Sequence, residues 1–327
     1  MSQEFERLAE PLRREIKVHC YRMLGSVQQA EDLVQESYLR AWRSFDKFDG
    51  GSMRAWLYKI ATNACLNAIE SRRLMQRLLP DQMGPATTQR PSGSPPADVV
   101  WLEPCPASYL EHVADDEPTP EGRYAARESV QLAFVAAIQQ LPARQRAVLL
   151  LCDVLGLASA EAATVLDVTT ASINSALQRA RATLAQRYPD GRPVVVPRPD
   201  AEQQRLLERY LAAWEQHDVE GFVALLKEDA AFTMPPWLQW YAGRDAIRSF
   251  FAVAWQTCGG VRLVPITANG QPAFAVYDYS SSDGQWHAHA IHVLTIRDHA
   301  IAALTAFQPP TGPNLFPAFG LPLFNPN

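Results

Sequence analysis

The sequence is poor in the features that mark membrane and secreted proteins. It contains no uninterrupted apolar run of about 18 residues, the length that a membrane-spanning helix requires. It also has no basic segment followed by an apolar one of the kind that directs secretion. We therefore expect a cytoplasmic protein that neither spans a membrane nor is secreted.

Cysteine is scarce and scattered. The five cysteines are Cys20, Cys65, Cys105, Cys152 and Cys258, and no two of them form a CxxC pair. An odd and dispersed set argues against a disulfide framework and against a cysteine-based zinc site. The pattern is typical of a reducing compartment, and we expect no metal and no other cofactor.

Surplus basic charge is also lacking, since the net charge is −5 over 327 residues. The charge is nevertheless uneven: residues 54–77 are mainly basic, whereas residues 98–128 are mainly acidic. Because nucleic acid responds to the local field, a negative total does not exclude DNA binding. With 47% hydrophobic and 20% charged residues, the chain is typical of a globular protein of two or three domains.

Residues 30–45 predict an amphipathic helix with an unusual outer face. At 3.6 residues per turn, one side is apolar and carries Ala30, Val34, Tyr38, Ala41, Trp42 and Phe45. Asp32, Gln35, Glu36 and Arg43 lie on the opposite side, with Leu39 among them. An acidic face with an apolar residue at its centre indicates a protein-docking surface.

A second helix is predicted to begin near Met53. Its apolar face carries Leu57, Ile60, Ala61, Ala64, Cys65 and Ala68, and its other face carries Trp56, Lys59, Asn63 and Asn67. An aromatic ring beside a cation and two amides suits an unstacked nucleic-acid base. The alternative, that Trp56 is a rim residue under a neighbouring helix, stays open.

These two segments resemble region 2 of the sigma-70 family, the promoter-recognition subunits of bacterial RNA polymerase. The resemblance rests on DLVQE (residues 32–36) and on RAWLYKIATNACLNAI (residues 54–69). It implies that the clamp formed by the largest subunits of core polymerase is contacted by Asp32, Leu33, Val34, Gln35, Glu36 and Leu39. It implies that the −10 promoter element is contacted by Phe48, Asp49, Gly50, Gly51, Ser52, Trp56, Lys59, Asn63, Asn67, Arg72 and Arg73, with Trp56 and Asn63 preferred.

A proline-rich, acidic linker follows over residues 80–120, where dense prolines exclude long helices and central strands. Within it, VVWLEPCPASYL (residues 99–110) is more apolar than a free tether. We expect this segment to be bound, either in a polymerase channel or against the C-terminal domain.

Residues 121–188 predict a second helical block that ends in a helix-turn-helix. Ser159 is expected to cap the first helix and Thr170 the second, with a turn at residues 167–169. The block resembles sigma region 4, which implies −35 DNA contacts by Thr170, Ser172, Asn174, Ser175, Gln178, Arg179 and Arg181. Because residues 173–177 are nearly uncharged, unlike many family members, phosphate binding by Arg179 and Arg181 is better supported than base readout. An ordinary helix-turn-helix repressor would leave DLVQE and Trp56 unexplained.

After a second proline-rich joint at residues 189–199, the chain predicts an α+β cone. Two helices are expected over residues 206–236 and a third over residues 243–255, followed by strands at 261–268, 272–281, 287–298 and 300–308. Core positions in the first two helices are Leu207, Leu211, Trp214, Phe222, Leu225 and Leu226. This block resembles the SnoaL-like, nuclear-transport-factor-2-like domains over residues 200–307, on phrases such as AFTMPPW and YAGRDAI.

The order of blocks resembles a subgroup of extracytoplasmic-function sigma factors. The expected multidomain fold has two all-α sigma domains, at 1–79 and 121–188, and an α+β cone at 200–327 with a C-terminal tail. The resemblance implies a binding subunit, not an enzyme, with core polymerase and promoter DNA as partners. We also expect the C-terminal domain to contact the sigma domains of its own chain and to regulate them.

A different function remains open for the cone, which encloses a pocket in ligand-binding and catalytic relatives. An unknown small molecule would be contacted by Met234, Trp237, Trp240, Tyr241, His287 and His289. His287 and His289 are expected on one strand face with His292 on the other; their spacing suits a metal pair, but no third ligand is evident. The alternative reading is therefore a SnoaL-like enzyme or ligand sensor fused to a DNA-binding module.

Overall fold

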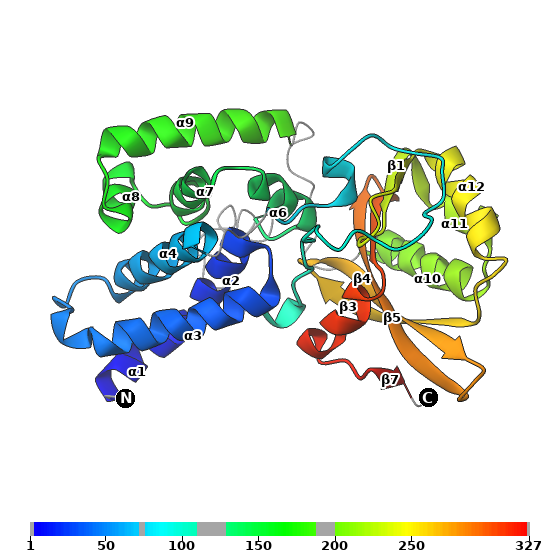
Figure 1. Ribbon diagram of the computed structural model, residues 1–327, viewed down its shortest axis with the longest axis horizontal. Helices are drawn as coiled ribbons and strands as arrows, with labels where there is room; N and C mark the ends of the chain where they lie inside the picture. The colour runs from blue at the N-terminus through cyan, green and yellow to red at the C-terminus, as the bar shows by residue number, and fades with distance from the viewer. Residues whose placement is uncertain (1–2, 72–75, 110–128, 188–199, 326–327) are drawn as a thin grey trace. The chain divides into compact units, whose positions relative to one another are not determined.

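The structure is a computed structural model that describes residues 3–71, 76–109, 129–187 and 200–325 (Figure 1). Arg72, Arg73 and the acidic residues 115–117 lie outside these ranges. The chain divides into two compact units. The N-terminal unit comprises residues 1–77 and 102–192, and the C-terminal unit comprises residues 78–101 and 193–327. The proline-rich linker is thus shared between the units.

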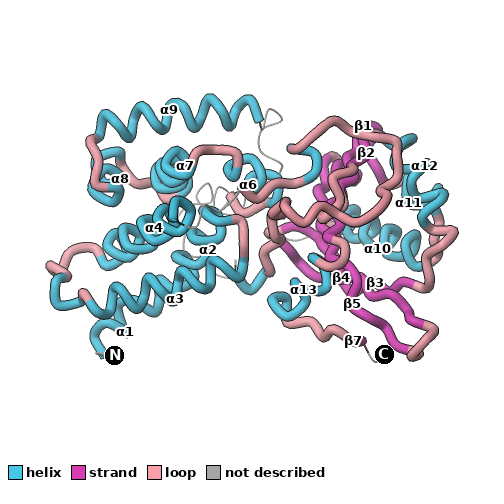
Figure 2. Tube along the Cα trace, viewed as in Figure 1, coloured by secondary structure: helices cyan, strands magenta, loops and turns pink. Residues whose placement is uncertain are grey.

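The described part of the N-terminal unit is helical, as expected (Figure 2). Its first helices are α1 (Gln3–Ala9), α2 (Arg13–Leu24), α3 (Val27–Arg43) and α4 (Met53–Ser71). Its later helices are α6 (Leu132–Gln139), α7 (Ala143–Leu149), α8 (Ser159–Leu166) and α9 (Thr170–Arg187). Shorter helical turns are η1 (Glu10–Leu12), η2 (Phe45–Lys47), η4 (Ala107–Tyr109) and the π-helical η5 (Leu150–Val154). None of the described helices is both long and apolar enough to span a bilayer.

The turn between α2 and α3 is stabilised by a linker residue. Gly25 ends α2 with φ +68°, a left-handed conformation that glycine adopts without strain. One carboxylate oxygen of Glu103 accepts hydrogen bonds from the Val27 amide and the Ser26 hydroxyl, both at 3.0 Å. The other oxygen accepts from Arg77 at 3.0 Å. Glu103 therefore caps the N-terminus of α3 across 76 positions of sequence.

The apolar linker segment is divided between the two units. Leu102 and Cys105 are fully buried in the N-terminal unit, and the Tyr109 hydroxyl donates to Glu31 of α3 at 3.1 Å. The ammonium of Lys17 on α2 lies 3.6 Å from the centre of the Tyr109 ring. Residues 102–109 are thus bound by α2 and α3, which was not expected, whereas residues 99–101 belong to the C-terminal unit, one of the two expected sites.

Two predicted helix caps are wrong by one residue. Thr169 caps α9, because its hydroxyl accepts the Ser172 amide at 3.2 Å, and Thr170 is the first helical residue. Likewise, α8 begins at Ser159, and the Ala158 amide before it donates to Glu161 at 2.8 Å. The turn between the two helices lies where expected.

The C-terminal unit is an α+β fold in which three helices accompany a curved sheet (Figures 1 and 2). The helices are α10 (Ala201–Glu215), α11 (Val219–Val223) and α12 (Arg244–Ala254). The main strands, in sheet order, are β2 (Trp240–Ala242), β1 (Leu226–Thr233), β6 (Ala300–Phe307), β5 (Gln285–Arg297), β4 (Gln271–Ser280) and β3 (Val261–Ala268). The remaining elements are η3 (Pro80–Gln82), α13 (Thr311–Leu315), η6 (Phe316–Phe319) and β7 (Phe324–Asn325), which pairs with β5.

One predicted helix is largely a strand. The second helix was expected to continue through Leu225 and Leu226, but α11 ends at Val223 and β1 begins at Leu226. β1 pairs with β2 on one side and with β6 on the other, the latter in parallel. Long-range strand pairing therefore overrides the local helical pattern.

Aromatic rings fill the core of the C-terminal unit. Trp214 of α10 lies 5.3 Å from Phe251 and 5.2 Å from Trp255, between ring centres. Tyr210 contacts the same cluster, and its hydroxyl shares a 2.9 Å hydrogen bond with Nδ1 of His292 on β5. His292 thus points into the core. The rings pack edge to face at distances that stabilise aromatic clusters.

Candidate nucleic-acid and polymerase interfaces

The outer face of α3 is accessible as the sequence predicted. Asp32, Gln35 and Arg43 are exposed, and Leu39 has 50% of its surface exposed. Glu36 is half-buried and forms an ion pair with Arg40, one turn further along the helix. The exposed side chains form a polar surface around an apolar residue.

Three residues of α3 differ in exposure from what the resemblance or the helical pattern implied; for Val34 the helical pattern was right and the implied contact was not. Leu33 and Val34 were implied as polymerase contacts, but they are 2% and 0% exposed and belong to the core. Trp42 was expected in the core, but it is 42% exposed. α2 and α4 both pack on α3, and the small Ala41 is buried there whereas the larger Trp42 next to it is not.

Trp42 instead extends the outer face of α3. It follows Leu39 by three residues, a spacing that places two side chains side by side on a helix. We refer to Asp32, Gln35, Glu36, Leu39 and Trp42 as the α3 docking face. The spacing of three residues between Leu39 and Trp42 could have indicated that Trp42 belongs to the outer face. From the helical pattern, Trp42 was instead assigned to the apolar face of the helix.

An aromatic platform forms where the loop after α3 meets α4. Phe45 and Phe48 stack with their planes 13° apart, at 5.9 Å between centres. The Trp56 ring lies 5.2 Å from Phe48. Trp56 is half-buried, so one part of it packs on Phe48 while another part remains accessible.

The loop residues before α4 have structural roles of their own. An Asp49 carboxylate oxygen accepts the Gly51 amide at 3.0 Å, and Gly50 adopts φ +80°. The Ser52 hydroxyl accepts the Ala55 amide at 3.2 Å and thereby caps α4. These contacts fix the position of the loop relative to Trp56.

The remaining predicted −10 contacts on α4 differ in accessibility. Asn67 is exposed and Lys59 is half-buried. Asn63 is half-buried, and its amide nitrogen donates to the carbonyl oxygen of Val165 on α8 at 3.4 Å. One preferred DNA contact is therefore engaged within the N-terminal unit.

The outer face of α9 is open. Ile173, Leu177 and Ala180 are buried at 1%, 8% and 0% exposure and hold α9 against its neighbours. All the predicted −35 contacts are exposed: Thr170, Ser172, Asn174, Ser175, Gln178, Arg179 and Arg181.

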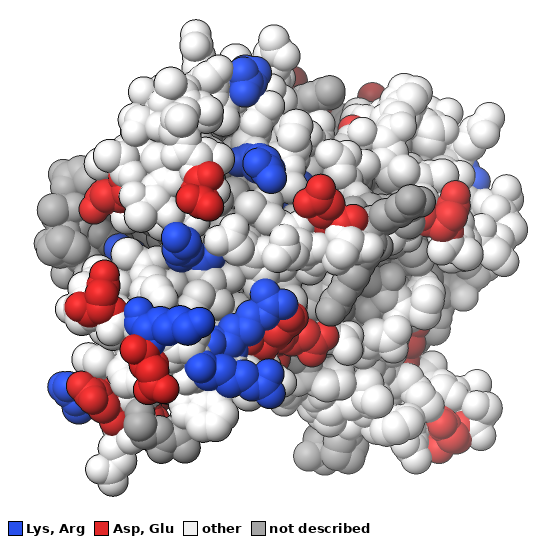
Figure 3. Space-filling view, turned by 60° about the vertical axis from the view of Figure 1, so that its left-hand side comes forward, with Lys and Arg blue, Asp and Glu red and all other residues white. Residues whose placement is uncertain are grey.

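The two α9 arginines have partners within the chain. Arg181 forms a two-pronged ion pair with Asp153 of η5, at 2.9 and 2.6 Å. Arg179 donates to the Ser175 hydroxyl at 2.8 Å. On the face drawn in Figure 3, basic side chains likewise lie beside acidic ones. Phosphate binding would replace these contacts.

Two of the expected pocket residues of the C-terminal unit, Trp240 and Tyr241, are held by residues of its own linker segment. Met234 and Tyr241 are buried in the core, whereas Trp237 and Trp240 are half-buried. The Trp240 indole donates to the Gly84 carbonyl at 2.8 Å, and the Thr87 amide donates to the Trp240 carbonyl at 2.9 Å. We refer to residues 84–89 as the linker strap.

The two candidate histidines do not form a common site. His287 contacts Asp283 at 2.7 Å, whereas His289 contacts Asp278 at 2.7 Å and Gln308 at 2.9 Å. A β-bulge leaves His289 without a paired residue on β4. The bulge interrupts the regular alternation of side chains along the strand, on which the prediction of a shared face for His287 and His289 depended. No three His, Cys, Asp or Glu side chains gather as metal ligands anywhere in the described residues.

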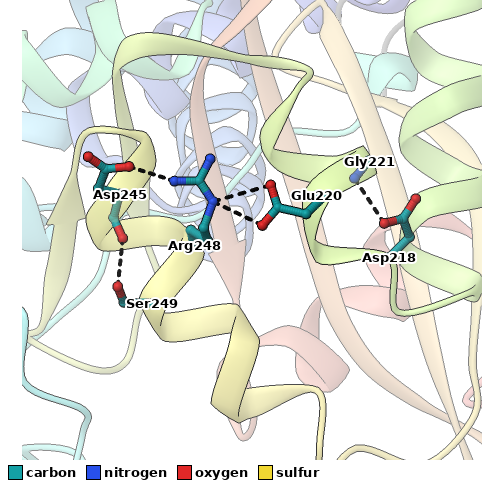
Figure 4. Close-up of polar contacts among 6 residues, drawn as sticks. All are labelled: Asp218, Glu220, Gly221, Asp245, Arg248 and Ser249. Carbon is teal, nitrogen blue, oxygen red and sulfur yellow. Dashed lines mark hydrogen bonds and ion pairs between the residues drawn. The ribbon is translucent and has the colours of Figure 1, made fainter.

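A charged cluster at α11 and α12 has a structural role. Figure 4 shows the Arg248 guanidinium between Glu220, at 3.0 Å, and Asp245, at 2.6 Å. Asp218 accepts the Gly221 amide at 2.9 Å and caps α11. Of these contacts, the one between Arg248 and Glu220 joins the two helices.

Comparison with known proteins gives matches along most of the chain. The family models for Sigma-70 region 2 and Sigma-70, region 4 match residues 8–74 and 131–184, and that for the SnoaL-like domain matches residues 207–304. The chain is 43% identical over 332 residues to the ECF RNA polymerase sigma factor SigG of Mycobacterium tuberculosis, covering 98% of this chain and 84% of that relative. It is 26% identical over 307 residues to SigJ of the same organism, covering 90% and 88%. The crystal structure of SigJ matches with a TM-score of 0.61 at 23% identity, over 96% of this chain and 98% of that chain.

Proposed function

Because this chain belongs to the extracytoplasmic function (ECF) sigma factors of RNA polymerase, we propose a specific role for each of its surfaces. The N-terminal unit binds core polymerase and promoter DNA in the bacterial cytoplasm. The C-terminal unit adjusts that activity and catalyses no reaction.

The α3 docking face binds the clamp of core polymerase. The observation that carries this assignment is the pair Leu39 and Trp42, whose exposed fractions are 50% and 42%. Apolar side chains surrounded by polar ones are the usual centre of a protein interface. Asp32 and Glu36 add negative charge, which steers association with a basic partner surface.

The two DNA surfaces lie on α4 and α9. Trp56 and Phe48 offer a ring surface on which a −10 base stacks once the strands separate. Lys59 supplies charge for the adjacent phosphate. α9 enters the major groove at the −35 element, where Arg179 and Arg181 hold phosphates and the polar residues between them contact bases.

Regulation acts through the linker strap. The linker is the covalent connection between α4 and α6, and its residues 78–101 belong to the C-terminal unit. A signal that weakens the hydrogen bonds of Trp240 and Tyr241 to the linker strap releases this segment. The free chain between the two DNA-binding regions then becomes longer. Linker length sets the effective concentration of one region near the other. Because aromatic side chains fill the core of the C-terminal unit, we favour binding of the linker strap over catalysis as the role of this unit.

Reconstituted transcription tests the proposal in two parts. Core polymerase with the full chain is expected to give promoter-specific transcripts that core alone does not give. The double variant Trp240→Phe with Tyr241→Phe removes two strap hydrogen bonds and keeps an aromatic ring at each position. We expect its transcript yield to change several-fold, whereas its melting temperature should fall by only a few degrees. Point variants are preferable to a truncation near residue 190, which would leave residues 78–101 without their partners.

The results can contradict either part of the proposal without the other. No specific transcripts from the wild-type chain would contradict the sigma-factor role. Wild-type transcripts with an unaltered yield from the double variant would contradict only the regulatory role of the strap.

A further inference from the structure

The first described helix is held in place by buried side chains. α1 has 7 residues, too few for an isolated helix to be stable in water. Phe5 and Ala9, one turn apart on this helix, are each 1% exposed. The carbonyl oxygen of Ala9 accepts a 2.8 Å hydrogen bond from the hydroxyl of Tyr38 on α3, which satisfies a group left open at the helix end. Contacts with the rest of the N-terminal unit therefore fix the position of α1.

Phe5 is the first of four aromatic rings that contact one another in turn. Its ring meets Phe45 edge to face, with 5.4 Å between the ring centres and 76° between the planes. Phe45 stacks on Phe48, and the Phe48 ring lies 5.2 Å from Trp56. We refer to Phe5, Phe45, Phe48 and Trp56 as the ring series. The series begins at a buried ring and ends at the half-buried Trp56.

The hydrogen bonds of the loop that carries Phe45 and Phe48 are local. The Phe48 amide donates to the Phe45 carbonyl oxygen at 2.9 Å, and the Gly51 amide donates to Asp49 at 3.0 Å. Such bonds shape the loop but do not connect it to a distant part of the unit. The contact between Phe5 and Phe45 makes such a connection, because α1 and η2 are far apart in the sequence.

This contact restricts the orientation of the loop rings. Edge-to-face pairs at this distance favour one relative orientation and add to the effect of burial. Phe45 stacks on Phe48, so its orientation influences that of the ring on which Trp56 packs. A base that binds a ring already held in one orientation orders less of the protein, so less conformational entropy is lost.

We propose that Phe5 is a positioning residue for recognition of the −10 element. It holds Phe45 and Phe48 so that Trp56 presents its ring to the unstacked base in one orientation. Phe5 is buried and acts only through the other members of the ring series. The proposal rests on the function assigned above, in which a −10 base stacks on Trp56 and Phe48.

A fluorescent base tests this role in the complete holoenzyme. Core polymerase and the full chain bind a pre-melted bubble of a promoter that they transcribe, with 2-aminopurine in place of an adenine in the unpaired −10 strand. Stacking of this base on an aromatic ring lowers its fluorescence, so a titration reports both affinity and stacking. Phe5→Leu keeps an apolar side chain in the core but removes the ring. We expect it to weaken binding of the bubble about fivefold and to leave the bound base more fluorescent.

Two further variants separate this role from general packing. Phe134→Leu makes the same change at another buried phenylalanine of the unit, on α6 and outside the ring series, and should leave the −10 signal unchanged. Phe45→Leu breaks the ring series at its half-buried second member and should reproduce the effect of Phe5→Leu. Co-elution with core polymerase and circular dichroism check that each variant folds and forms holoenzyme.

A double-mutant cycle identifies Trp56 as the residue through which Phe5 acts. In a Trp56→Ala background, Phe5→Leu should weaken binding by less than about twofold, because the ring that it positions is already absent. A full fivefold loss in that background would overturn the proposal, since the effect of Phe5 would then be independent of Trp56.

The remaining outcomes separate this inference from the proposed function. A base that stacks in the wild-type complex and stacks equally well with Phe5→Leu would overturn the positioning role alone. A wild-type holoenzyme in which the −10 base does not stack would contradict the −10 contact assigned to Trp56, and the inference would fall with it.

Discussion

The hydroxyl of Tyr241 donates a hydrogen bond to the carbonyl oxygen of Gln89 over 2.9 Å, across 152 positions of sequence. Together with the two Trp240 contacts, this bond makes part of the linker an integral piece of the C-terminal unit. A domain that appears last in the sequence thereby holds a segment from between the two DNA-binding regions.

The first prediction concerns this bond. Tyr241→Phe should release the linker strap locally at a cost of about 1 kcal/mol. The Thr87 amide, which donates to Trp240, should then exchange its hydrogen about fivefold faster. Hydrogen exchange followed by mass spectrometry measures this, with Tyr279→Phe, at a tyrosine that is 44% exposed, as the control. Equal exchange in the two variants would show that the hydroxyl does not hold the strap.

The second prediction concerns the α3 docking face. Asp32→Lys with Glu36→Lys should abolish co-elution with core polymerase, because it reverses charge beside Leu39 and Trp42. The free energy of unfolding should change by less than about 1 kcal/mol, since Asp32 is exposed and Glu36 loses only a surface ion pair. Gln28→Lys, at an exposed position of the same helix, is the control and should co-elute normally. Retained co-elution of the double variant would contradict the assignment.

The third prediction separates DNA opening from recruitment. Trp56→Ala should weaken strand opening more than initial promoter binding, because base stacking contributes roughly 1–3 kcal/mol. A pre-melted promoter bubble should restore part of the activity, and Trp56→Phe should retain more of it than alanine does. Since Trp56 also packs on Phe48, melting temperatures are needed alongside. Equal loss on duplex and bubble templates would assign Trp56 to packing.

The fourth prediction concerns acid stability. Burial, with a smaller effect of nearby His289, lowers the pKa of His292 from 6.5 to about 3. Between these values the unfolded chain binds a proton that the folded chain excludes. Stability is therefore fully present above pH 6.5 and falls by about 1.4 kcal/mol per pH unit below it. His19 in the N-terminal unit should add a similar dependence, since burial also lowers its pKa to about 3.

Urea unfolding of the full chain at pH 7 and pH 5 measures this loss. Trp214, 4.4 Å from His292 between ring centres, reports on the C-terminal unit. His292→Gln should flatten the pH dependence of that transition, whereas His299→Gln, at an exposed residue, should not. The same pH dependence in both variants would contradict the buried, neutral state of His292.

Local patterns in the sequence predicted much of the fold. The sigma-70 and SnoaL-like resemblances are confirmed by the family and relative matches. The strand at residues 261–268 has the bounds expected for it. The outer face of α3 likewise follows from helical spacing alone, apart from Trp42.

Features that depend on distant partners were not predictable. β1 was taken for a helix because its local sequence follows a helical pattern, whereas its parallel partner β6 lies far along the chain. The position of Glu103 on the N-terminus of α3 leaves no local signal, and neither does the Asn63 contact with Val165. Such contacts join residues whose separation exceeds any periodic pattern.

Mapping of transcript 5′ ends tests the central claim most directly. Genomic DNA is transcribed by core polymerase with and without the full chain, and the start sites are sequenced. A sigma factor predicts new start sites that appear only with the chain and share two upstream motifs, near −10 and −35. The Arg179→Ala and Arg181→Ala variants should weaken use of these sites without changing the −10 motif. Start sites identical to those of core polymerase alone would contradict the account.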